Sequence, residues 1–271
     1  MKLATWNVNS LKVRLPHVLE FLDRHKPDAL CLQELKLEDV NFPLAAINAA
    51  GYQAVYSCQR TYNGVAILTP TAAADVCAGI PSLEDLQRRV IAATVNGVRV
   101  ICVYIPNGEA IESEKYKYKL DWLQALTAWL KQEVATHPKL ALLGDYNIAP
   151  EDRDVYDPKA WAGKVLFSDP EKAAFKGIAD LGLTDSFRMF DQADKSYSWW
   201  DYRMNGFKRN LGLRIDHILL SPELAKACTR CAIDRDFRAK ERPSDHAPVI
   251  AEIEMPEDWP QRTQGTQNEG A

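Results

Sequence analysis

The chain has 271 residues, of which 46% are apolar and 26% are charged, and its formal net charge is -4. This composition is typical of a soluble globular protein with one large or two small α/β domains. No apolar stretch approaches the roughly 20 residues that span a bilayer, and the first ten residues lack the apolar run of a secretory signal. We therefore expect a cytoplasmic protein without a membrane segment.

Strand-like and helical segments alternate in the first half of the chain. In order, the patterns predict a strand at 2–9, a helix at 14–26, a strand at 28–34, a helix at 40–50, and strands at 52–59 and 64–70. Asn96-Gly97 then lies between two β-branched runs, which is a strong hairpin signal. Part of the sheet is therefore expected to be antiparallel.

The second half continues the mixed pattern. Residues 114–135 carry an apolar stripe at helical spacing, and a strand that ends near Asp145 follows them. After an irregular stretch at 151–170, the patterns predict a helix at 171–181 and strands at 197–200, 214–221 and 248–255. This order suggests a single layered α/β domain with packed sheets over residues 1–256. Residues 257–271 are polar and aperiodic, and we expect a disordered tail there.

Carboxylate and carboxamide side chains stand at the ends of five predicted strands. They are Asn7 and Asn9, Glu34 in phase with Leu30 and Leu32, Asp145 and Asn147, Asp216, and Asp245 next to His246. Each motif alone is weak, because Asn and Asp favour turns and Glu often caps a helix. Five together are harder to explain locally, because clustered carboxylates repel one another unless a cation or protons lie between them.

Hard oxygen ligands without cysteine favour Mg²⁺ or Mn²⁺ over zinc. Because Mg²⁺ keeps several waters and binds substrate phosphate, the strand ends predict metal-dependent hydrolysis of a phosphodiester. Cys228 and Cys231 form a lone C-x-x-C without the further ligands that a zinc site needs, so we assign no metal to them.

Two short basic segments contrast with the acidic total. Between residues 199 and 214, four basic residues face only Asp201, and residues 114–122 interleave lysine with tyrosine. Both segments are candidate phosphate-binding surfaces. From composition alone, solvated faces with snorkelling side chains are slightly favoured.

Six segments carry a resemblance to a known family. They are "TWNVNSLKVRL", "LCLQELK", "VYIPNG", "LLGDYNIAPEDRDV", "SYSWWDYRMNGFKRNLGLRIDHIL" and "ERPSDHAP". In this order they resemble the signature segments of the exonuclease III family of DNA repair nucleases, the class II apurinic/apyrimidinic (AP) endonucleases, and the bacterial branch is the most similar. The resemblance runs from residue 1 to about 255. It implies an α/β fold in which two facing mixed β-sheets, flanked by helices, form a four-layered sandwich.

The resemblance also implies roles for individual residues. Metal-binding positions are matched by Glu34, Asn7 and Asp245, and catalytic positions by Asp145, Asn147, His246, Tyr104, Asp216 and Asp245. Among these, Asp145 would activate or orient the attacking water, and Asp245 would fix the orientation of His246. Positions that contact DNA are matched by Asn107, Trp199, Arg203, Lys208 and Arg209.

The implied function is Mg²⁺-dependent cleavage of double-stranded DNA by a monomer, 5′ to AP sites and at 3′ ends, with Mn²⁺ as a substitute. A first alternative is a member specialised as a 3′-phosphatase or exonuclease with weak AP cleavage, through changes beside a sugar pocket near residues 157–170. A second is a phosphatase of the same fold with a non-DNA substrate, against which the basic loop after Trp199 argues. A third is a nucleic-acid-binding scaffold with a relic site, although all the expected catalytic positions are filled.

Overall fold

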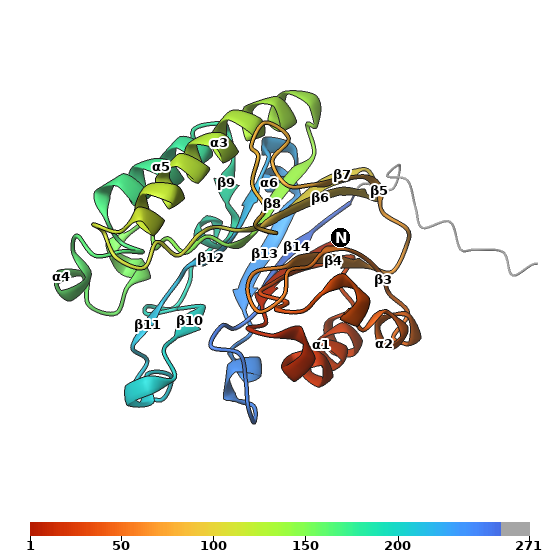
Figure 1. The fold of residues 1–271 in the computed structure, drawn as a ribbon, viewed down its shortest axis with the longest axis horizontal. Helices are drawn as coiled ribbons and strands as arrows, with labels where there is room; N and C mark the ends of the chain where they lie inside the picture. Colours follow the sequence, from red (N-terminus) through yellow and green to blue (C-terminus); the bar gives the residue numbers. More distant parts are fainter. Residues whose placement is uncertain (256–271) are drawn as a thin grey trace, which may run out of the picture.

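Two six-stranded β-sheets face each other in the computed structural model, which describes residues 1–255 (Figure 1). The first sheet has the order β13-β14-β1-β2-β4-β3, and the second has the order β5-β6-β7-β8-β12-β9. The strands of the first sheet are β1 (Lys2–Asn7), β2 (Ala29–Gln33), β3 (Gln53–Ser57), β4 (Val65–Thr69), β13 (Cys228–Ile233) and β14 (Val249–Ile253). Those of the second are β5 (Ala74–Ala78), β6 (Val90–Val95), β7 (Val98–Tyr104), β8 (Leu140–Asp145), β9 (Thr184–Asp185) and β12 (Asp216–Leu220).

Helices cover the outer faces of the sheets and complete four layers (Figure 1). The first sheet packs against α1 (Leu11–His25) and α2 (Leu44–Ala49), and the second against α3 (Glu114–Thr136) and α5 (Asp169–Ala179). Each sheet contains one parallel pair, β1 with β2 and β7 with β8, beside antiparallel pairs. The predicted sandwich of two mixed sheets is confirmed. No helix within residues 1–255 is long and apolar enough to cross a bilayer.

The alternation of side chains along β8 shows how the layers form. Leu140 and Leu142 pack with α3 on the outer face, whereas Ala141 and Leu143 pack between the two sheets. Because side chains alternate with a period of two, Asp145 continues the inner row. The strand that fills the core therefore also delivers a carboxylate to the space between the sheets.

Local patterns predicted most of these elements and missed several short ones. The hairpin at Asn96-Gly97 is present, with Val95 paired to Val98. The predicted helix at 40–50 is a short 3₁₀ helix (Asp39–Asn41) followed by α2, and the irregular stretch contains α4 (Pro158–Trp161). Strands β5, β9, β11 (Gly212–Leu213) and β13 and helix α6 (Pro222–Ala227) were not predicted. The predicted strand at 197–200 contains β10 (Trp199–Trp200), which pairs with β11. The expected tail at 257–271 lies outside the described residues.

Candidate active site

The carboxyl-terminal ends of β1, β7 and β8 meet the start of β12 at one edge of the facing sheets. In the sheet register, Asp145 lies opposite Tyr104 on β7 and opposite Asp216 on β12. Paired strands lie roughly 5 Å apart, so the side chains of these three residues are neighbours. Gly144 allows this close approach, since a Cβ there would lie 1.9 Å from the carbonyl oxygen of Val103.

Asn7, the last residue of β1, joins two of the predicted acidic residues. Its Nδ2 donates hydrogen bonds to Glu34 Oε1 and to Asp145 Oδ2, each at 2.8 Å. The backbone N–H of Asn9 donates to Asn7 Oδ1 at 2.9 Å, which fixes the orientation of the amide. Asn7 is fully buried, so it holds both carboxylates at one place away from bulk water.

Glu34 reaches this place because its backbone leaves the strand. A regular continuation of β2 would put it on the face of Leu30 and Leu32, which pack against α1. Its φ of 54° is left-handed, and the carboxylate instead accepts a hydrogen bond from Tyr104 Oη at 2.9 Å and pairs with Lys36 Nζ at 2.7 Å. The strand phase that we predicted for Glu34 is therefore wrong, and a local backbone turn brings it to the site.

Asp145 is almost completely buried beside like and unlike charges. Its Oδ1 accepts the backbone N–H of Asn147 at 2.9 Å. Burial raises the pKa of Asp145 to about 7, with the charge of His246 opposing the shift and that of Asp216 reinforcing it. A carboxyl group with a pKa near neutrality is suited to exchange a proton with water under physiological conditions.

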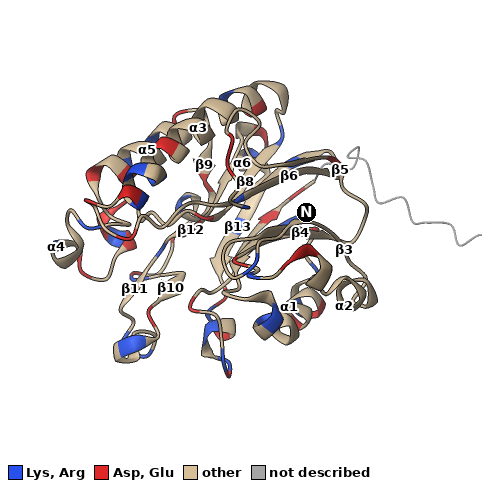
Figure 2. Cartoon of the chain, viewed as in Figure 1, with Lys and Arg blue, Asp and Glu red and all other residues tan. Residues whose placement is uncertain are grey.

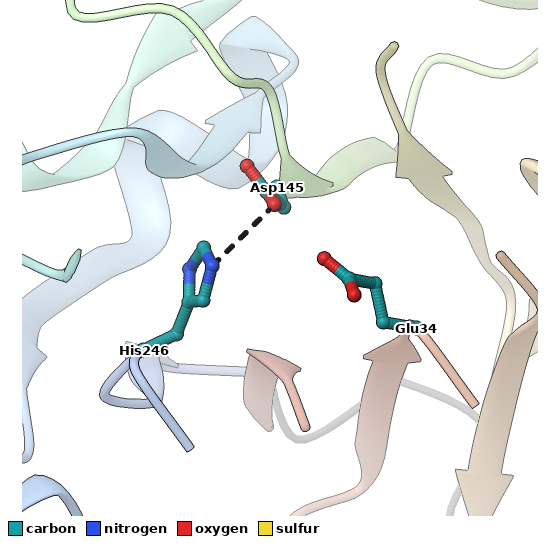
Figure 3. Close-up of side chains that lie close together, drawn as sticks. All are labelled: Glu34, Asp145 and His246. Carbon is teal, nitrogen blue, oxygen red and sulfur yellow. Dashed lines mark ion pairs between the residues drawn. The ribbon is translucent and has the colours of Figure 1, made fainter. Parts of the chain in front are cut away.

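His246 lies between two aspartates. Its Nδ1 is 2.9 Å from Asp216 Oδ2. Its Nε2 faces Asp145 (Figure 3) and is 3.7 Å from Asp145 Oδ2. Burial alone would lower the pKa of His246, but the charges of Asp216 and then Asp145 outweigh it and raise the pKa to about 10. The imidazole is therefore held as a cation that can donate from Nε2.

Asp245 does not take the position predicted for it. We expected it to orient His246, but the carboxylate at Nδ1 is that of Asp216. Asp245 instead accepts hydrogen bonds from Asn9 Nδ2 and Trp199 Nε1, each at 2.9 Å. Burial would raise the pKa of Asp245, but the charge of His246 and these two donors hold it below its usual value.

Glu34, Asp145 and His246 form a group of possible metal ligands in which one atom from each lies within 4.8 Å of the others (Figure 3). A protonated imidazole has no lone pair for a metal, so the two carboxylates are the better ligands. Two acidic oxygens with room for water match the preference of a hard cation such as Mg²⁺. Asp245, predicted as a third metal-binding residue, is outside this group.

Tyr104, Asn107 and Asn147 place neutral donors around the carboxylates. Burial, followed by the charges of Glu34 and Asp145, raises the pKa of Tyr104 far above its usual value, so its phenol stays protonated. Asn147 has a left-handed φ of 49° and donates from Nδ2 to the carbonyl oxygen of Ile105 at 3.0 Å. Asn107 Nδ2 donates to Asn147 Oδ1 at 3.0 Å, which joins the two amides.

An apolar surface adjoins the polar centre through Trp199. This half-buried indole donates to Asp245, pairs in register with Leu213 and packs on the cluster that includes Ile215 and Leu166. Beside it, a pocket of about 290 Å³ is lined by Tyr156, Trp161, Trp199, Asp201, Arg203, Met204, Gly206 and Leu211. The contributions of Leu213 and Ile215 were missed, although their alternation in "LGLRID" gave a signal.

The predicted basic residues lie on a loop that projects beyond β10 and β11 (Figure 2). Arg203, Lys208 and Arg209 are exposed there, and Arg203 pairs with Asp201 at 2.7 Å. Trp200 and His217 are next to predicted site residues in the sequence, but their contacts are structural. Trp200 is fully buried, and His217 bonds Arg214 and the carbonyl oxygen of Ile148.

Comparisons with known proteins agree with this geometry. Residues 4–246 match the Endonuclease/Exonuclease/phosphatase family. Exodeoxyribonuclease III of Haemophilus influenzae is 38% identical over 93% of this chain and all of its own. The structure of the 3′ phosphatase NExo from Neisseria bound to a product DNA hairpin is 54% identical, with a TM-score of 0.93 over 94% of this chain and all of that one. An AP endonuclease from Archaeoglobus fulgidus is 39% identical, with a TM-score of 0.90 over the same shares.

Proposed function

This chain belongs to the Endonuclease/Exonuclease/phosphatase family and is a DNA repair nuclease, and we propose that it uses Mg²⁺ to cleave phosphodiesters at abasic sites and at 3′ ends. The observation that carries the proposal is the site in which Asn7 holds Glu34 and Asp145 together while Asp216 holds His246 as a cation. This site combines metal ligands, a base and a proton donor within one buried cluster.

The metal would be held by Glu34 and Asp145, with Asn7 orienting both carboxylates. When bound, Mg²⁺ polarises the phosphoryl group and offsets developing negative charge. Mn²⁺, which takes similar oxygen ligands, would substitute. We assign no metal contact to Asp245 beyond the prediction from the resemblance, because it lies outside the group formed by Glu34, Asp145 and His246.

Asp145 would orient the attacking water and accept its proton. Without a metal its pKa is about 7, and a bound cation would lower it, so the carboxylate form would be populated at neutral pH. His246 would donate from Nε2 to an oxygen of the scissile phosphate, with Tyr104 and Asn147 as further donors. His246, held in place by Asp216, would stabilise developing charge without reorganising, which is how such sites lower a barrier. Tyr104 and Asn147 would first release hydrogen bonds that they donate within the protein.

Trp199 and its apolar neighbours would receive the sugar of an abasic nucleotide. Without a base to unstack, such a nucleotide leaves the duplex at low cost. The exposed Arg203, Lys208 and Arg209 would contact the phosphate backbone, and Asn107 would contact DNA beside the scissile bond. Contacts of this kind position a duplex without reading its sequence.

A second candidate is a 3′-end specialist with weak AP cleavage, and it is favoured by the 54% identity to a 3′ phosphatase. Two duplexes separate the candidates, one with an internal AP-site analogue and one with a nicked 3′-phosphate. Comparable kcat/KM on both would support the broader proposal. Strong turnover of the second duplex alone would reject AP cleavage as a main activity. No turnover of either duplex with Mg²⁺ or Mn²⁺ would reject the proposed function.

The alternative of a phosphatase with a non-DNA substrate has no support from the relatives found, which are DNA nucleases.

We also propose that residues 1–256 act as one domain and that the protein works as a cytoplasmic monomer. One apolar cluster contains residues of both sheets, including Leu3 and Val100, which supports a single folding unit. Size-exclusion chromatography with light scattering tests whether the protein is a monomer in solution.

A further inference from the structure

Lys119, on the first turns of α3, is a buried cation outside the catalytic cluster. Its side chain is 0% exposed, and its Nζ pairs at 2.5 Å with Glu171 of α5, which is also 0% exposed. The remaining two donors of the ammonium go to the carbonyl oxygens of Asn147 at 2.7 Å and Asn107 at 3.1 Å. An ammonium has three donors, so every one of them is used.

Both carbonyl groups belong to residues whose amide side chains face the site. Asn107 and Asn147 bond each other, and Asn147 adopts the left-handed conformation with φ at 49°. A left-handed backbone outside glycine is strained and persists only where its surroundings hold it. The bond from Lys119 Nζ to the Asn147 carbonyl oxygen supplies that hold.

Glu171 extends the same contacts toward the apolar surface. Its Oε1 accepts hydrogen bonds from the backbone N–H of Leu166 at 3.0 Å and from Lys119 Nζ. Its Oε2 accepts hydrogen bonds from the backbone N–H and the hydroxyl of Ser168. Leu166 has a left-handed φ of 75° and belongs to the apolar cluster that packs with Trp199. One ion pair therefore fixes main-chain groups beside the carboxylates and beside the apolar pocket.

Stability alone is a weak reason for such a pair. Removing two charges from water costs several kcal/mol per ion, and apolar replacements of buried pairs are often neutral or stabilising. Glu171 also forms a capping box with Ser168 at the start of α5, but a cap does not need a buried lysine. Lys119 adds a fixed hydrogen-bond donor to the carbonyl groups of Asn107 and Asn147, beside the proposed active site.

We propose that the Lys119–Glu171 ion pair is a positioning device that sets the amides of Asn107 and Asn147 for the phosphate and the Leu166 turn for the sugar. The proposal rests on the proposed nuclease function for its kinetic consequence. Its structural consequence, the placement of the two amides, is independent of that function.

A matched control shares helix α3 with the Lys119–Glu171 pair. Arg99 of β7 pairs with Glu133 of α3 at 2.7 Å, with side chains only 6% and 14% exposed. Arg99 also donates to the carbonyl oxygen of Asp75. Glu133 follows Lys119 by 14 residues, which is roughly 21 Å along a helix, so this pair ties α3 to β7 far from the site.

The test compares neutral double variants, Lys119→Met with Glu171→Gln and Arg99→Met with Glu133→Gln. Each removes both charges and so avoids a lone buried ion, and thermal unfolding reports the stability of both. On the 3′-phosphate duplex we expect the first variant to lose about 10- to 100-fold in kcat with a smaller change in KM, the scale expected of small misplacements. The control should keep its kcat at a similar melting temperature.

Isotope-labelled asparagine gives a second measurement without any substrate. The side-chain amide signals of Asn107 and Asn147 should shift or broaden in the first variant and stay in place in the control. Unchanged amide signals, or full kcat in a folded Lys119→Met and Glu171→Gln variant, would overturn the positioning role. A wild-type protein inactive on both duplexes would instead reject the nuclease function, and the amide signals would still decide the role of the pair.

Discussion

Asp145 and Asp216 lie directly opposite each other on the antiparallel strands β8 and β12, each only 1% exposed, and His246 contacts both. Two buried carboxylates at adjacent positions repel each other unless positive charge is supplied. The cationic imidazole of His246 supplies part of that positive charge. A metal held by Glu34 and Asp145 would supply more. The expected effects of substitutions at the site follow from this balance between negatively and positively charged groups.

Asp145→Asn should abolish most hydrolysis and leave the fold intact. The amide cannot accept the proton of the attacking water, and general-base catalysis typically contributes about 10²–10⁴-fold. Losing one of two facing carboxylates also removes repulsion, so the melting temperature should stay equal or rise. Kinetics on the 3′-phosphate duplex and thermal unfolding check both points, with Asp121→Asn on the exposed face of α3 as the control. Full Mg²⁺-dependent activity in Asp145→Asn would reject the role of Asp145.

Asp216→Asn should lower the pKa of His246 from about 10 toward 6.5. A raised histidine pKa stabilises the fold fully below pH 6.5, and this contribution is lost as the pH rises through about 10. The variant should therefore lose stability below pH 6.5 and show a flatter decline above it. Titration of the imidazole by NMR in metal-free protein measures the shift directly. A larger shift in Asp245→Asn than in Asp216→Asn would contradict the pairing seen here.

Glu34→Gln should weaken Mg²⁺ binding by about tenfold or more, the lower end of losses seen when even supporting groups of metal sites are removed. Calorimetric titration with Mg²⁺ gives the affinity, and the half-saturating Mg²⁺ concentration for hydrolysis gives the functional effect. Glu38→Gln, an exposed acid four residues away, serves as the matched control. Equal Mg²⁺ affinity in Glu34→Gln and wild type would remove Glu34 from the metal site.

His217→Gln should reduce the loss of stability in mild acid. Burial and then the charge of Arg214 lower the pKa of His217 to about 4, against a usual value of 6.5. Between these two pH values only the unfolded chain binds the proton, so stability falls as the pH drops through this window, by roughly 3 kcal/mol in total. Glutamine can keep the bonds to Arg214 and Ile148 without titrating. Urea unfolding at pH 7 and pH 4 checks this, and an acid slope equal to that of wild type or of His137→Gln would refute it.

Local patterns in the sequence were sufficient for the layered fold and for most of the site. The apolar run Leu140–Leu143 identified the strand that ends at Asp145, and Asn96-Gly97 identified the hairpin. Short or edge elements such as β5 and β13 were not predicted, because few residues and exposed faces weaken the periodic pattern of apolar residues. The ends of strands carried the candidate residues because polar groups there can reach a shared edge without disturbing the core.

The sequence by itself determined which residue types stand at the strand ends and, through six ordered motifs, the family. Only the tertiary structure decided how they pair. Asp216 rather than the adjacent Asp245 holds His246, because the packing of the two facing sheets brings together residues 30 positions apart, and no local pattern encodes that packing. The left-handed turn at Glu34 and the ion pair beneath Asn147 likewise depend on packing between sheets and helices. Chain-local propensities fix faces and ends, whereas the contacts that tune charge arise only when distant segments pack together.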